Sequence, residues 1–162
     1  MTPTKPLNLA LLSVVAVAVA YAMLHLLATR GVHLAPVPYL VAVVELFLAG
    51  VVFAAGWTVR AYLRGDKPEL SGLRAMRFVV LGKATSHAGV VLFGWYAAQA
   101  ILAATQLQFE PQRARALSAG LAAVGALVLI VAGYVTERFG RIPPSDGGDS
   151  VGESDEPSGQ SA

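Results

Sequence analysis

The chain alternates between long apolar runs and short polar stretches, and four of the runs are long enough to cross a membrane. They cover about residues 8–28, 39–59, 78–102 and 117–136. A transmembrane helix needs roughly 20 mostly apolar residues, and an isolated span satisfies its backbone groups in lipid only as a helix. The pattern therefore predicts an all-α, polytopic integral membrane protein with four transmembrane helices in an antiparallel bundle.

Turn-forming residues separate the predicted helices. Gly31 follows the first run, where a glycine commonly ends a helix, and Pro111 precedes the fourth, where a proline in the first turn costs no hydrogen bond. Residues 1–141 are expected to form one membrane domain. Residues 142–162 contain five acids and no Lys or Arg, and such a segment cannot bury enough apolar surface to fold. This segment is predicted to be a disordered acidic tail.

Composition supports a membrane protein and narrows its chemistry. Of the 162 residues, 56% are apolar and 14% are charged, against about a quarter charged in soluble domains. The absence of cysteine excludes disulfides and thiol chemistry. The basic residues lie at helix ends and form no basic face with stacking aromatics, so nucleic-acid binding is not expected. No cluster of ligands predicts a metal site, and nothing predicts a cofactor.

The basic residues also predict the orientation. Eight of them flank the spans on the side of the two termini: Lys5, Arg60, Arg64, Lys67, Arg74, Arg77, Arg138 and Arg141. Three lie on the other side: Arg30, Arg113 and Arg115. Connections rich in Lys and Arg stay in the cytoplasm. We therefore expect a multi-pass protein of the plasma membrane with both termini in the cytoplasm.

The first run has an alternative interpretation. Lys5, the apolar run and the small residues Ala20 and Ala22 resemble a secretory signal with its cleavage site. The run continues past that site to Ala28, which favours a retained span.

Ionisable groups within membrane spans are costly and are candidates for function. Glu45 lies six residues into the second run, roughly 9 Å below its end. His25 and Gln99 lie at the same end of the first and third runs, so the three side chains can converge. One hypothesis is a cation or proton site on Glu45; the other, which we favour at this point, is a hydrogen-bonded clamp between helices.

A second polar cluster consists of Lys83, Ser86 and His87 in the opposite half of the third run. Lys83 is near enough to the interface for its ammonium group to reach water along its apolar stem. Two histidines can also hold a haem, but His25 and His87 differ in depth by roughly 12 Å, which does not suit two axial ligands.

The connection between the second and third runs is basic. Arg60, Arg64, Arg74 and Arg77 are predicted to contact anionic lipid headgroups or, alternatively, a cytosolic partner. Small residues are frequent in the spans, for example Gly82 four residues before Ser86, and they favour close helix packing. They leave open a homo-oligomer or another membrane protein as a partner.

Three short motifs carry a resemblance to a known family. They are the opening Thr-x-x-Lys-Pro-Leu, then Arg74-Ala75-x-x-Phe78, then Gly94-Trp95-Tyr96-Ala97-x-Gln99. Over about residues 2–140 the chain resembles a family of small actinobacterial membrane proteins known as domain of unknown function 3180. The resemblance implies an actinobacterial plasma membrane and assigns no catalytic residue.

Three hypotheses for function remain. The leading one is a non-enzymatic accessory or interaction protein, because the connections are short and no soluble domain is predicted to house chemistry. The alternative is a small transporter or channel subunit that acts through Glu45. An intramembrane enzyme comes third, because no nucleophile and base lie at one depth.

Overall fold

The structure is a computed structural model that describes residues 5–32, 35–64 and 72–140, with only the backbone described at 63 and 72–75. These residues form four helices, α1 (Pro6–Thr29), α2 (Leu40–Leu63), α3 (Gly72–Ala104) and α4 (Glu110–Phe139), and none of the described residues lies in a strand. Each helix is long and apolar enough to cross a membrane. The predicted fold class is confirmed. The predicted tail, 142–162, lies outside the described residues.

Helices α1, α3 and α4 extend beyond the predicted spans at both ends, whereas α2 begins one residue inside its span and extends beyond it only at its C-terminal end. The extensions arise because helical structure continues into polar residues that the apolar count leaves out. The predicted boundary residues behave as expected. Gly31 follows α1 with a φ of 76°, a left-handed conformation that glycine adopts without steric cost. Pro111 lies in the first turn of α4.

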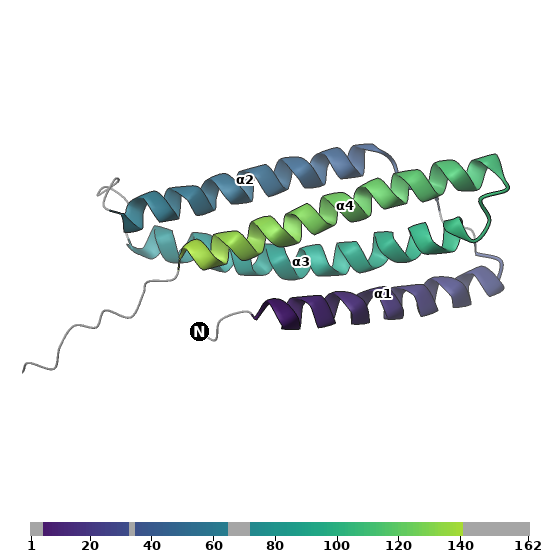
Figure 1. Ribbon diagram of the computed structural model, residues 1–162, viewed down its shortest axis with the longest axis horizontal. Coiled ribbons are helices and arrows are strands. Elements are labelled where there is room, and N and C mark those ends of the chain that lie inside the picture. Colours follow the sequence, from purple (N-terminus) through teal and green to yellow (C-terminus); the bar gives the residue numbers. More distant parts are fainter. Residues whose placement is uncertain (1–4, 33–34, 65–71, 141–162) are drawn as a thin grey trace, which may run out of the picture.

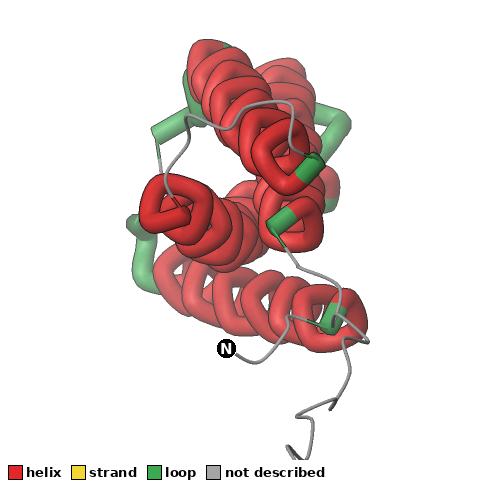
Figure 2. Tube along the Cα trace, turned by 90° about the vertical axis from the view of Figure 1, so that its left-hand side faces the viewer, coloured by secondary structure: helices red, strands yellow, loops and turns green. Residues whose placement is uncertain are grey.

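The helices pack in the spatial order α1, α3, α4, α2, which differs from their order in the chain (Figure 1). Helix α3 has α1 on one side and α4 on the other, while α2 packs mainly on α4. Consecutive helices run in opposite directions, so α1 is parallel to its neighbour α3, and α2 is parallel to α4 (Figure 1). The end-on view shows α1 outermost (Figure 2). The α1–α2 and α3–α4 connections lie at the same end of the bundle, which we call the first end.

Helix α4 forms the centre of the bundle. In its most apolar stretch 50% of the residues are buried, against 11% in α1. Small residues bring it close to α3: a Cβ on Gly133 would lie 2.6 Å from the carbonyl oxygen of Gly82, and one on Gly82 would lie 2.9 Å from that of Gly133. Likewise, Gly94 of α3 lies against Ala16 of α1. The packing role predicted for small residues is confirmed at these positions.

A hydrogen bond between side chain and backbone joins α4 to α2. The hydroxyl of Thr136, which is fully buried, donates to the carbonyl oxygen of Val52 over 3.0 Å. Gly56 makes room for it, because a Cβ there would lie 2.5 Å from the Thr136 hydroxyl. This contact fixes the register of α2 against α4 in the half of the bundle opposite the first end.

Candidate functional site

Glu45 is a buried carboxylate in the interior of the bundle. It lies in the second turn of α2, on the face that packs against α4, and is only 4% exposed. One turn further along the same face, Ala49 contacts Leu129 and Ala132 in an apolar core cluster. Helix α2 thus places an ionisable side chain in an otherwise apolar helix–helix interface.

The surroundings of Glu45 give it space but no hydrogen-bond partner. Its carboxyl group lies against Gly125 of α4, where a Cβ would come within 2.6 Å of Oε2. Tyr96 of α3 is close enough to interact electrostatically with the carboxylate. Both carboxyl oxygens are buried, and neither makes a hydrogen bond with any residue that the structure describes.

A carboxyl group in this setting has limited chemical options. An isolated carboxylate buried away from water costs many kcal/mol unless it takes up a proton or meets a cation. On the Gly125 side the carboxyl group meets backbone, and no described residue donates a hydrogen bond to either oxygen. The position is therefore suited to binding a proton or a small cation, and among the described residues no hydrogen bond of Glu45 supports a clamp.

The predicted convergence of Glu45 with His25 and Gln99 does not produce a hydrogen-bonded cluster. His25 is exposed on α1, where its ring stacks on Tyr21 with 6.0 Å between centroids. Helix α1 packs on α3 and has no packing contact with α2, so His25 and Glu45 lie on helices that do not meet. Gln99 lies nearer the first end and lines a cavity there.

That cavity has a volume of about 280 Å³ and lies among the ends of α1, α3 and α4 and the connection after α1. We call it the first-end cavity. One part of its wall is apolar, with Leu24 and Leu102 among its residues. The other part carries four polar side chains, Gln99, Gln106, Gln112 and Arg115.

The second predicted cluster, Lys83, Ser86 and His87, is held by bonds within α3. The Ser86 hydroxyl donates to the carbonyl oxygen of Lys83 over 2.9 Å, and Nδ1 of His87 lies 2.8 Å from the same oxygen. Ser86 is fully buried against α4, whereas His87 is exposed. The three residues are close together on one helix, and the Ser86 and His87 side chains bond to its backbone.

The basic residues predicted to contact lipid headgroups lie at the end of the bundle opposite the first end. The guanidinium group of Arg60 stacks over the rings of Trp57 and Phe139, 5.7 Å and 4.9 Å from their centroids. Arg64 and Arg77 are exposed, and the side chain of Arg74 is not among those that the structure describes. Cation–π contacts thus hold the Arg60 guanidinium group against two aromatic rings at this end of the bundle.

Comparison with protein families matches residues 9–144 to the model of a family described as Protein of unknown function (DUF3180). The match covers well over half of the 162 residues. The chain belongs to the DUF3180 family. Neither a curated protein nor a solved structure matches the chain. Membership in the DUF3180 family assigns no activity, so the site has to be interpreted from its own geometry.

Two features of this DUF3180 chain escaped the sequence analysis. Glu137 is 6% exposed, because the buried stripe of α4 continues one residue past the predicted end of the span at residue 136. It takes part in an interaction within the chain. Arg115 served only to predict orientation, although its side chain lines the first-end cavity. The signal for Glu137 was present in the helical spacing of Leu129, Gly133 and Glu137.

Acidic and imidazole side chains are scattered over the bundle. Within 5–32, 35–64 and 72–140, no three His, Asp or Glu side chains gather closely enough to hold a metal ion. Glu45 is thus a single carboxyl group, whose additional ligands for a cation would have to be backbone carbonyls, water or the Tyr96 hydroxyl.

Proposed function

We propose that this DUF3180 protein is a small membrane transporter or channel subunit in which Glu45 binds a proton or a monovalent cation. The observation that carries the proposal is the burial of both Glu45 carboxyl oxygens with no hydrogen-bond partner among the described residues. A structural clamp needs a partner, whereas a binding site needs an unsatisfied group. The geometry therefore favours binding over the clamp that the sequence suggested.

The neighbours of Glu45 support binding of a small ion. Gly125 presents backbone to the carboxyl group, which occupies the space that a side chain at residue 125 would fill. Tyr96 places a hydroxyl group near the charge. A proton or a small cation is the ligand that such a narrow, singly charged position accommodates without a further acidic residue.

In the proposed setting, the protein spans the plasma membrane with both termini in the cytoplasm. The excess of basic residues at the end opposite the first end supports this orientation. Glu45 then lies in the outer half of the bilayer. A reporter fused after residue 141 is expected to be active only in its cytoplasmic form; activity of a periplasmic reporter there would reverse the assignment.

The test is ion flux in proteoliposomes that contain the full-length protein. Proton flux and the flux of Na⁺ and K⁺ are measured for the wild type, Glu45→Gln and Glu110→Gln. Glu110 is the matched control because it is exposed and paired with Arg113 at the first end. The proposal is supported if the wild type and Glu110→Gln give more flux than empty vesicles and Glu45→Gln does not. No flux with the wild type, or equal flux with Glu45→Gln, contradicts it.

A second candidate function is that of an accessory or interaction protein, without enzymatic activity, that packs against another membrane helix. It is favoured by Gly50 and Ala54, which stand four residues apart on the exposed face of α2. A Cβ on Gly50 would meet no atom of the described residues within 4 Å, so none of them packs against this position. Small residues at this spacing allow two membrane helices to approach closely.

Crosslinking in native membranes followed by mass spectrometry tests the accessory function. A stoichiometric partner that is lost in Gly50→Leu and retained in the lipid-facing control Val43→Leu supports it. Recovery of the chain alone, or only of its homo-oligomer, leaves the transporter proposal as the account of the protein. An intramembrane enzyme, the third hypothesis from the sequence, gains no support from the described residues.

A further inference from the structure

The first-end cavity contains polar side chains that the protein itself does not use. Gln99, Gln106, Gln112 and Arg115 all line it. None of these four side chains makes a hydrogen bond or an ion pair with another described residue. Gln106 is exposed and the other three are half-buried, so their amide and guanidinium donors are accessible to a ligand in the cavity.

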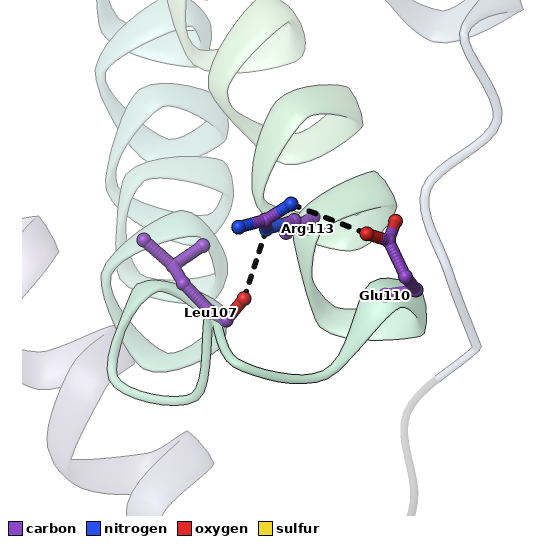
Figure 3. A network of polar contacts seen from close by, with 3 residues as sticks. All are labelled: Leu107, Glu110 and Arg113. Atoms are coloured by element: carbon purple, nitrogen blue, oxygen red, sulfur yellow. Dashed lines mark hydrogen bonds and ion pairs between the residues drawn. The ribbon is translucent and has the colours of Figure 1, made fainter.

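Arg113, at the same end of the bundle, differs from these four residues because its side chain has partners. Its Nε donates to the carbonyl oxygen of Leu107 over 3.0 Å, and its terminal nitrogen lies 3.2 Å from Oε1 of Glu110 (Figure 3). Arg113 therefore closes the α3–α4 connection. Arg115, two residues further along α4, lines the cavity and has no such partner.

The charge at this end favours an anion. The described residues there include three arginines, Arg30, Arg113 and Arg115, and one glutamate, Glu110. Glu110 is paired with Arg113, and no acidic side chain lines the cavity. A concave site with one sign of charge raises the local concentration of the opposite ion.

We propose that the first-end cavity binds an oxyanion group, a phosphate or a carboxylate, with Arg115 as the principal contact. The guanidinium group presents paired N–H donors that match two oxygens of such a group, and the three glutamine amides add further donors. The apolar wall beside them, with Leu24 and Leu102, contacts the rest of the ligand. The oxyanion belongs either to a lipid headgroup or to a small water-soluble molecule.

The size of the cavity is consistent with this class of ligand. A volume of about 280 Å³ is at the lower end of the range of small-molecule pockets, roughly 300–1,000 Å³. The inference does not rest on the proposed function of Glu45. Arg115 and Gly125, which marks the level of Glu45 on α4, are ten residues apart, roughly 15 Å along the helix. Failure of one proposal therefore leaves the other intact.

The experiment measures binding to the full-length protein with defined probes. Inorganic phosphate and succinate are titrated into the detergent-solubilised protein. In a second arm, the protein is reconstituted with phosphatidylglycerol or phosphatidylcholine, and the lipids it retains are counted by native mass spectrometry. Both arms compare the wild type with Arg115→Gln, Arg115→Lys and the matched control Arg113→Gln. The thermal unfolding midpoint of each variant verifies that it is folded.

Arg115→Gln is expected to weaken binding at least tenfold, which corresponds to about 1.4 kcal/mol. Arg115→Lys keeps the charge and retains part of the binding, and Arg113→Gln changes it less than Arg115→Gln does. Binding of phosphate or succinate indicates a soluble ligand, and selective retention of phosphatidylglycerol indicates a lipid headgroup. The proposal is wrong if the wild type binds none of these probes, or if Arg115→Gln binds as well as the wild type.

Discussion

The carboxyl group of Glu45 in α2 lies against Gly125 in α4, at a point where a Cβ on the glycine would come within 2.6 Å of Oε2. Residues 45 and 125, far apart in the chain, thus depend on each other, because the carboxyl group of Glu45 fits in the core only where Gly125 has no side chain. Neither oxygen of Glu45 is bonded to another described residue.

Gly125→Ala should displace the Glu45 carboxyl group. The added methyl group overlaps with Oε2, and overpacking of this kind costs about 1–3 kcal/mol in a packed core. The matched control is Gly120→Ala on the same helix, where a Cβ meets no atom within 4 Å. Thermal unfolding in detergent should show a lower midpoint for Gly125→Ala only. Equal midpoints would mean that Glu45 does not occupy this position.

Glu45→Gln should not lower stability. The glutamine has nearly the same shape, it carries no charge, and the substitution removes no hydrogen bond that the structure describes. A hydrogen-bonded clamp predicts the opposite, a loss of about 0.6 kcal/mol. The measurement is the unfolding midpoint across a range of pH, with Glu110→Gln as the control at an exposed position. A clear loss of stability for Glu45→Gln would indicate a partner for the carboxylate.

Thr136→Val should weaken the contact between α4 and α2. It keeps the shape of the side chain and removes the hydrogen bond to the carbonyl oxygen of Val52, a type of bond that contributes about 0.6 kcal/mol and at most about 1.7 kcal/mol in membrane proteins. Thr58→Val is the control, because the Thr58 hydroxyl bonds to Ala54 within its own helix. Unfolding in denaturing detergent should separate the two variants; indistinguishable curves would place the stabilisation elsewhere.

The helices could be predicted from the sequence because span length depends on a local property, the count of apolar residues against the thickness of lipid. Gly31 and Pro111 also act locally, and both mark helix ends as expected. The spatial order of the helices could not be predicted in this way. It depends on which faces meet, and small residues such as Gly82 and Gly133 permit contact without specifying the partner helix.

The site was predictable in part. Glu45 stood out because an ionisable residue in an apolar run is costly wherever the run packs. Its supposed partner His25 was chosen by depth alone, and depth does not show that α1 and α2 lie apart. The role of Arg115 was missed because a residue at a helix end looks the same in sequence whether it faces solvent or a cavity.

The most direct test of the central claim is the reaction of the protein with dicyclohexylcarbodiimide, an apolar reagent that modifies protonated carboxyl groups buried in membranes. Peptide mass spectrometry should find Glu45 modified and the exposed Glu110 unmodified, with modification of Glu45 suppressed by high pH or by the cation that binds there. That result would show a carboxyl group that exchanges its ligand with the solution. If Glu45 stays unmodified at every pH, or if neither pH nor Na⁺ nor K⁺ affects its modification, Glu45 is an inert part of the core and the proposed function is wrong.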